Sequence, residues 1–129
     1  MREHEFERFD NYLLDSESYI KNYLSVKDHM VHLALDNEKV VGFMIASHTT
    51  NYIMSLVLLY VGQHYRRQGI ARLLKTALER LSKMRGYTQI VSQVRTNNAP
   101  SIALNNKAGW TAEPDKIYPD SYVWFTKDL

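Results

Sequence analysis

Residues 52–84 join an apolar run to an amphipathic segment through a short basic turn. The run YIMSLVLLYV (52–61) is rich in β-forming residues, which is typical of a strand covered on both faces. Apolar residues of the following segment recur at helical spacing on one stripe: Ile70, Leu73, Leu74, Ala77, Leu78, Leu81 and Met84. Charged residues fall on the opposite side: Arg72, Lys75, Glu79, Arg80 and Lys83. A buried strand that leads into such a helix predicts a sheet with helices packed on it.

The rest of the chain alternates in the same manner. Further predicted elements are one or two helices before Val26, a hairpin of strands over 30–36 and 40–47, a strand over 87–94, a short helix over 100–108 and a final strand within 120–129. Pro100 and Gly109 mark the ends of the short helix. The predicted fold class is α/β, with a mixed, mostly antiparallel sheet flanked by helices.

Composition limits the classes of protein that fit. The 129 residues suit a single domain over 1–129, and no apolar run approaches the ~20 residues of a membrane span. The absence of cysteine excludes disulfides and thiolate metal sites, and we expect no metal. The net charge of +2 is too small to indicate nucleic acid. These features, with a charged N-terminus, predict a cytoplasmic protein that binds neither membrane nor nucleic acid.

The basic turn before residue 70 has the character of an anion site. Arg66, Arg67 and Arg72 surround Gly69, which lets the backbone approach a ligand without a Cβ. Amides in the first turn of a helix lack internal partners, so they can bind a phosphate or pyrophosphate. A solvated basic surface would have the same composition. Neither GxxxxGK[ST] nor GxGxxG occurs, which excludes those two phosphate-binding loops.

Two motifs in order resemble those of the GNAT superfamily of acyl-CoA-dependent N-acyltransferases. The segment RRQGIA (66–71) is similar to the family's Gln/Arg-x-x-Gly-x-Gly/Ala turn. The segment NNAPSIALNNKAGW (97–110) is similar to its Asn-x-x-Ser/Ala-x-x-Leu-Tyr-x-Lys-x-Gly-Phe pattern. The resemblance covers residues 30–129 and implies the GNAT fold, with the run 52–61 as the family's fourth strand and its first strand missing or replaced here.

The resemblance also implies a cosubstrate, acetyl-CoA, and residues that bind it. The pyrophosphate would lie on the turn, and the pantetheine arm would pair with the main chain of the preceding strand. Asn98, with Ser101, would bind the arm, although Asn98 also suits a plain helix cap. The implied cofactor-binding residues are Leu59, Tyr60, Val61, Arg66, Arg67, Gln68, Gly69, Ile70, Ala71, Arg72, Asn98, Ser101 and Asn105.

Two departures from the family pattern concern catalysis. Asn105 stands where the family has a tyrosine that protonates the departing thiolate, and an amide can only donate a hydrogen bond there. The strand over 51–61 carries no carboxylate to accept the proton of the amine. We therefore predict Asn105 and Tyr118 as catalytic residues. The other candidates, each of which also suits a structural role, are His48, His64, Tyr65 and Tyr122.

The sequence leaves two functions open. The first is an enzyme that transfers the acetyl group of acetyl-CoA to a primary amine, of a small molecule or a protein, by direct attack in a ternary complex, because no cysteine can carry an acyl group. The alternative is a non-catalytic acyl-CoA-binding regulatory module of the same fold. An uncovered sheet edge would favour a homodimer, with the last strand (121–127) or the N-terminal helices contributing.

Overall fold

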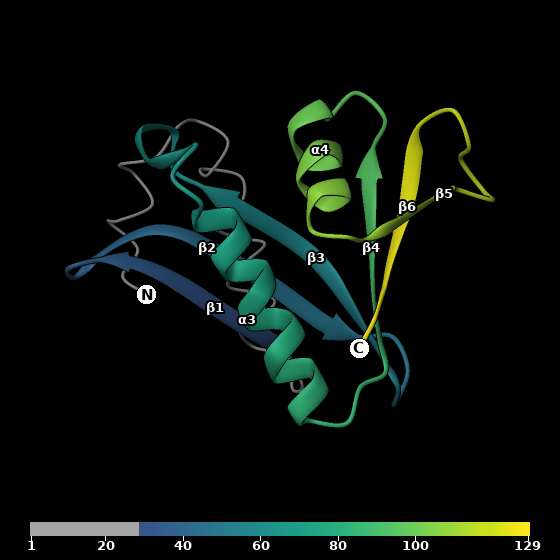
Figure 1. Cartoon of the computed structure of the whole chain (residues 1–129), viewed down its shortest axis with the longest axis horizontal. Helices are drawn as coiled ribbons and strands as arrows, with labels where there is room; N and C mark the ends of the chain where they lie inside the picture. The colour runs from purple at the N-terminus through teal and green to yellow at the C-terminus, as the bar shows by residue number, and fades with distance from the viewer. Residues whose placement is uncertain (1–28) are drawn as a thin grey trace.

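The computed structural model describes residues 29–129, which form six strands, two α-helices and one short 3-10 helix (Figure 1). The elements in chain order are β1 (His29–Asp36), β2 (Lys39–His48), β3 (Ile53–Val61), η1 (Gln63–Tyr65), α3 (Ile70–Met84), β4 (Gln89–Arg95), α4 (Ala99–Lys107), β5 (Thr111–Pro114) and β6 (Tyr122–Asp128). The predicted mixed sheet with flanking helices is thus confirmed. The helices expected before Val26, and the region where a first strand was expected to be missing, lie outside the described residues.

The strands form one sheet in the order β1-β2-β3-β4-β6-β5. Neighbouring strands are antiparallel except β3 and β4, which run parallel. β6 pairs with β4 on one side and β5 on the other, so the last strand is not the sheet edge through which we expected a dimer to form. Sequence analysis missed β5, whose four residues are all exposed.

A β-bulge divides β3 into two parts. Ile45 pairs with Leu58 and Ala46 with Leu56, which leaves Val57 without a partner on β2. The extra residue reverses the alternation of side chains, so Leu56 packs in one core cluster with Leu59 while Leu58 packs in the other. A bulge also bends its strand and increases the twist. β3 therefore changes direction near its middle.

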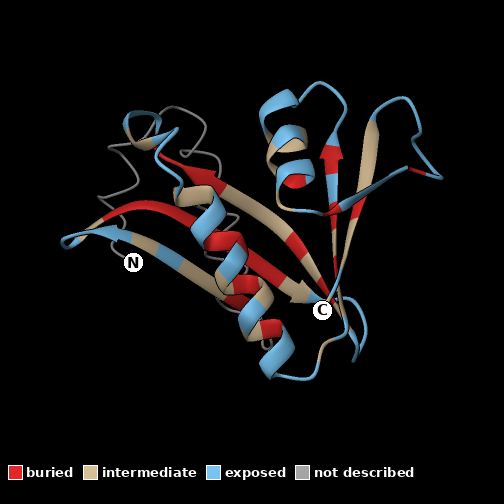
Figure 2. Ribbon diagram, viewed as in Figure 1, coloured by how far each residue is buried: buried red, intermediate tan, exposed pale blue. Residues whose placement is uncertain are grey.

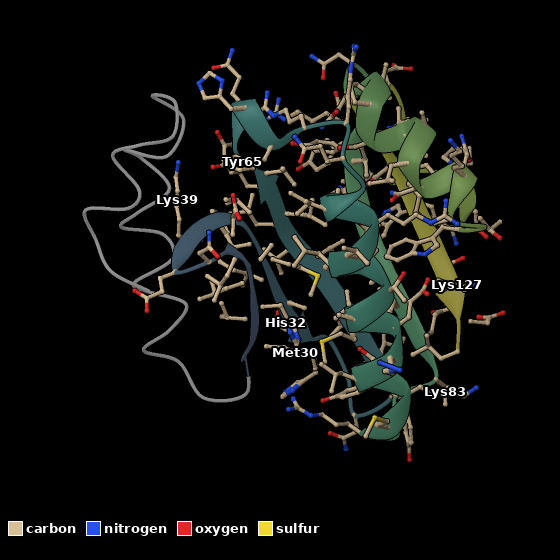
Figure 3. The ribbon with its side chains drawn as sticks, turned by 60° about the vertical axis from the view of Figure 1, so that its left-hand side comes forward. Met30, His32, Lys39, Tyr65, Lys83 and Lys127 are labelled. Atoms are coloured by element: carbon tan, nitrogen blue, oxygen red, sulfur yellow. The ribbon has the colours of Figure 1, made fainter. Side chains whose placement is uncertain are left out.

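The larger core lies between the sheet and the two helices (Figure 2). Leu74 and Leu78 of α3 pack there with Met30 of β1, which Figure 3 labels. The buried stripe of α3 differs from the predicted one. Leu73 and Met84 are 70% and 74% exposed, and the buried positions are Leu74, Lys75, Leu78 and Ser82. The prediction that Lys75 faces away from the core was wrong.

Gly42 keeps β2 and β3 in close contact. A Cβ built on Gly42 would lie 2.9 Å from the main-chain oxygen of Tyr60. No side chain fits at that distance without a shift of the β3 backbone, so glycine at this position fixes where the C-terminal half of β3 lies.

Candidate active site

The sheet opens between its two parallel strands. The β3–β4 ladder runs from Ile53↔Gln89 to Leu56↔Ser92 and ends directly before the bulge at Val57. Beyond that point the strands diverge, with α4 beside the opening (Figure 1). A cavity of about 600 Å³ occupies this wedge. Its lining comes from β3, β4, β6, α3, α4 and Arg66 of the basic turn, so the main chain of β3 after Leu56 faces a cavity instead of a described strand.

The basic turn lies between β3 and α3. Gly69 precedes the first residue of α3 with φ of 82°, and its main-chain oxygen accepts the helical hydrogen bond from Leu73. Arg67 also has a positive φ, 64°, which is unusual for a residue with a side chain. A Cβ on Gly69 would meet no protein atom within 4 Å. The space on the Cβ side of Gly69 is thus open next to the first turn of α3, where helix amides lack internal partners and an anion can bind.

Arg66 and Tyr65 are held close to the end of β3. Nε of Arg66 donates a hydrogen bond of 3.0 Å to the main-chain oxygen of Val61, and its guanidinium carbon lies 5.5 Å from the centroid of the Tyr60 ring. Nζ of Lys39 donates to the hydroxyl of Tyr65 at 3.3 Å (Figure 3). These contacts connect the turn to β3 through Arg66 and to β2 through Tyr65.

The N-terminus of α4 borders the same cavity. Oδ1 of Asn98 accepts a hydrogen bond of 3.3 Å from the main-chain N–H of Ser101, so Asn98 caps the helix. Both residues also line the cavity. The cap that sequence analysis offered as an alternative is therefore real, and it leaves the side-chain NH₂ of Asn98 available for a further role.

Lys75 and Asn105 form a buried polar pair on the cavity wall. Their side chains are 5% and 1% exposed, and Nζ of Lys75 donates a hydrogen bond to Oδ1 of Asn105. Nζ also lies 4.0 Å from the ring centroid of Trp110, whose Nε1 donates to Glu79 at 2.8 Å. The amide Nδ2 of Asn105 is buried with no hydrogen-bond partner.

Burial changes the acidity of Lys75. Loss of hydration lowers its pKa from 10.5 to about 8, and the negative charge of Glu79 opposes that shift. The other charged side chains on the cavity wall are Arg66 and Arg95, and no carboxylate of the described residues lines it. The cavity is therefore suited to an anionic ligand.

Comparison with known proteins identifies the architecture. The model of the acetyltransferase (GNAT) family matches residues 1–110, most of the chain. The chain belongs to the GNAT acetyltransferase family. The human protein N-acetyltransferase 8 is 28% identical over 101 residues, covering 74% of this chain. The chain spans only 44% of the length of that relative.

Two solved structures show the same GNAT fold. A PaiA N-acetyltransferase from Thermoplasma acidophilum, in complex with coenzyme A, superposes with a TM-score of 0.72 at 19% identity, over 92% of this chain and 68% of that one. A GNAT family acetyltransferase from Elizabethkingia anophelis, with acetyl-CoA bound, gives a TM-score of 0.76 at 17% identity, over 89% and 84%.

The predicted site residues fall into two groups. Those that line the cavity are Leu59, Tyr60, Arg66, Asn98, Ser101 and Asn105. The others lie outside this lining, at the end of β3, in the basic turn and at the start of α3: Val61, Arg67, Gln68, Gly69, Ile70, Ala71 and Arg72. Apart from Val61, the second group follows Arg66 directly along the chain, and Gln68 and Ile70 line a second cavity beside β1 and α3.

Tyr118 does not line the cavity. Its side chain is 57% exposed, and its main-chain N–H, like that of Ile117, donates to Oδ1 of the buried Asp115 at 2.7 Å. These hydrogen bonds lower the pKa of Asp115, and the one from Tyr118 has the largest effect. The side chain of Gln93 donates a third hydrogen bond to Asp115, at 2.6 Å. Asp115 thus fixes the loop between β5 and β6.

Tyr122, unlike Tyr118, lines the cavity. Its ring lies 6.2 Å from that of Tyr118 and stacks with the guanidinium of Arg95 at 5.6 Å. The exposed His48 and His64 do not line the cavity, nor does Tyr65. Of the catalytic residues proposed from sequence, only Asn105 and Tyr122 therefore line the cavity.

Sequence analysis missed Lys75 as a site residue. Its place on α3 beside the buried Leu74 and Leu78 was the available signal, because positions 74, 75, 78 and 82 share one helix face. A lysine at a core position is a stronger indication of a site than a lysine on a polar stripe.

Two absences apply to the described residues. No helix among residues 29–129 has the length and apolar character that crossing a membrane requires. Across the same range, no three His, Cys, Asp or Glu side chains gather into a group that could hold a metal ion.

Proposed function

We propose that the protein is an acetyl-CoA-dependent N-acetyltransferase. The observation that carries this proposal is the broken β3–β4 ladder, which leaves strand main chain facing a cavity that Arg66 of the basic turn also lines. An extended, amide-containing arm that ends in a pyrophosphate matches both features. The coenzyme A and acetyl-CoA complexes of the two solved GNAT structures support the same cosubstrate.

Each part of the cosubstrate has a binding group in this proposal. The amides of Ile70, Ala71 and Arg72 hold the pyrophosphate, with Arg67 and Gln68 at the rim. Main-chain groups of Leu59, Tyr60 and Val61 pair with the pantetheine arm as a strand would. The NH₂ of Asn98, with Ser101, holds the arm from the α4 side, and Arg66 faces the phosphate end.

The reaction in this proposal is direct attack of a primary amine on the thioester. The chain has no cysteine to carry the acetyl group, which favours a ternary complex. Asn105 donates a hydrogen bond from its Nδ2, and fixed positioning of the two substrates supplies a large part of the acceleration. Since no carboxylate of the described residues lines the cavity, the amine loses its proton to solvent or to a group outside it.

Two measurements test the proposal together. Acetyl-CoA at ~100 times its dissociation constant should raise the free energy of unfolding by about 2.7 kcal/mol, visible as a higher melting temperature. A thiol-release assay with acetyl-CoA and a panel of polyamines, aminoglycosides, amino acids and peptides should then identify an acceptor. Absence of any stabilisation by acetyl-CoA would refute the cosubstrate.

The absence of a lining carboxylate, and Asn105 in place of tyrosine, favour a second candidate: a regulatory module that binds acyl-CoA without turnover. Tight binding with no thiol release for any amine would support it. Three further expectations belong to this proposal: one domain over residues 1–129, a cytoplasmic location, and no metal, membrane or nucleic-acid partner.

A further inference from the structure

Among residues 29–129, the buried ammonium of Lys75 has no ionic partner at contact distance. Within the described residues, its three N–H groups have one hydrogen-bond acceptor, the neutral Oδ1 of Asn105, and an aromatic face, that of Trp110. Glu79, its nearest acidic neighbour along α3, accepts a hydrogen bond from Trp110. Burying a charge this way is unfavourable unless something else on the wall compensates it.

A second unfilled donor lies beside the first. Nδ2 of Asn105 is buried and without a partner, and Asn105 and Lys75 both line the cavity in the wedge. Nδ2 of Asn105 has no acceptor and the ammonium of Lys75 has only a neutral one, so the two donors indicate a further acceptor that arrives with the ligand. A ligand atom that becomes negatively charged in the cavity is the acceptor that fits these two donors best.

Resting on the proposed function, we propose that Lys75 is the catalytic residue that protonates the departing CoA thiolate, while Asn105 positions it and donates a hydrogen bond to the same sulfur. In a thioester aminolysis, the sulfur is the atom that leaves with a full negative charge. Lys75 and Asn105 thus share between them the donor role for which an amide alone is insufficient.

The protons and electrons balance as follows. The amine nitrogen bonds to the carbonyl carbon, and the π electrons move to oxygen. When the carbonyl re-forms, the C–S bond breaks with its electron pair on sulfur, which takes a proton from Nζ of Lys75. The new amide nitrogen loses its extra proton to solvent, and the neutral Lys75 regains one from solvent.

The acidity of Lys75 suits this transfer. Its pKa of about 8 is close to the ~8.5 of an ordinary thiol, so the proton moves between nearly matched groups. The charged and titratable groups that face the site are Glu79 on α3, Arg66 at the end of the β3 loop, Arg95 on β4 and Tyr122 on β6.

The first test measures the thiol of bound coenzyme A and needs no turnover. The ultraviolet absorption of the thiolate, followed against pH, gives the pKa of the bound thiol. With the wild-type protein, we expect this pKa to lie about one pH unit or more below that of free coenzyme A, because an ammonium stabilises the adjacent thiolate. Lys75→Met should remove the difference, and Lys83→Met, an exposed lysine on the same helix, should preserve it.

The second test is kinetic. Lys75→Met should lower kcat by about 100-fold with little change in the KM for acetyl-CoA, and Lys83→Met should stay within about twofold of wild type. In the wild type, kcat should fall as the pH rises through the pKa of Lys75, and this alkaline limb should vanish in Lys75→Met. Glu79→Gln keeps the acceptor for Trp110 but removes the opposing charge, so it should move the limb to lower pH.

Lys75→Arg separates charge from proton transfer. Its guanidinium keeps the positive charge but cannot release a proton. The variant should retain the lowered pKa of the bound thiol and lose the rate.

Three results would overturn the proposal. The first is a bound thiol whose pKa equals or exceeds that of free coenzyme A in the wild type, a measurement that stands even where Lys75→Met does not fold. The second is an equal thiol pKa in wild type and Lys75→Met. The third is acetylation of Lys75 on incubation with acetyl-CoA alone, seen by mass spectrometry, which would make it a nucleophile. Failure of the wild type to bind coenzyme A would instead refute the proposed function.

Discussion

Burial of Lys75 should make the stability of the fold depend on pH. Its pKa falls from 10.5 in the unfolded chain to about 8 in the folded one, so the unfolded state binds the proton more tightly. Below pH ~8 this difference destabilises the fold fully, by an estimated ~3 kcal/mol at 1.36 kcal/mol per pH unit. Between pH ~8 and ~10.5 the penalty disappears, so the free energy of unfolding rises with pH in that window.

We therefore predict that Lys75→Met is more stable than the wild type at pH 7 and loses this advantage toward pH 10.5. Chemical denaturation of both proteins at pH 7, 9 and 10.5 measures the difference. Lys83→Met controls for removal of one positive charge and should show no such trend. A Lys75→Met advantage that is constant with pH would mean that Lys75 does not change its protonation on folding in this range.

The turn before α3 permits a separation of main chain from side chain. Gly69→Val adds atoms to the open space at a φ of 82°, where it should block the pyrophosphate and strain the backbone. Arg67→Gly removes a guanidinium at a φ of 64° that glycine adopts freely, so it should preserve the turn. We predict that Gly69→Val weakens coenzyme A binding more than Arg67→Gly or Arg67→Ala, measured by calorimetry. The reverse order would assign the binding to the arginines.

Residues of the turn could be found from sequence, because the segment RRQGIA resembles a motif of the GNAT superfamily and a second motif follows it in order. Lys75 was missed, because the amphipathic pattern of α3 favours the wrong stripe. Two stripes of α3 share Leu74 and Leu78, and the one with Leu73 and Leu81 is the more apolar. The buried face of α3 instead includes Lys75 and Ser82, and Asn105 and Trp110 give the lysine a hydrogen-bond acceptor and an aromatic face there.

The helix α4 begins at Asn98, for which two roles are predicted: capping the helix and binding coenzyme A. Asn98→Ser keeps a side-chain oxygen for the cap but removes the NH₂, whereas Asn98→Ala removes both. We predict that Asn98→Ala lowers the free energy of unfolding by ~1 kcal/mol and that Asn98→Ser leaves it nearly unchanged. Both should weaken coenzyme A binding by about 1 kcal/mol, the contribution of one hydrogen bond. Unaltered affinity in Asn98→Ser would limit Asn98 to capping.

Most helices and strands could be predicted, because the apolar residues of each recur with a single period, that of a helix or that of a strand. The bulge in β3 was not, since both faces of the run 52–61 are apolar and a change of face leaves no mark in such a run. The strand β5 was missed because TAEP has four exposed residues and no alternation, and only its pairing with β6 defines it.

At the scale of the whole molecule, β1 is one edge of the sheet within residues 29–129 and exposes Leu33 and Leu35. Since an exposed edge with apolar side chains favours pairing, we predict a homodimer through β1 in place of the last strand. Light scattering at micromolar concentration should give twice the monomer mass, and Leu35→Lys should shift it to the monomer. A monomeric wild-type protein would contradict this prediction.

The wedge between β3 and β4 also bears on how the chain avoids aggregation. An unpaired strand is normally a hazard, because any other protein can extend it. Here the half of β3 that pairs with β2 but not with β4 lies inside the sheet, with β4, α3 and α4 around its open side, so a partner must enter between two strands. A folded protein is too thick for that space, whereas a single slender chain is not. On its β4 side, β3 can therefore pair with a slender ligand but not with a strand of another folded protein.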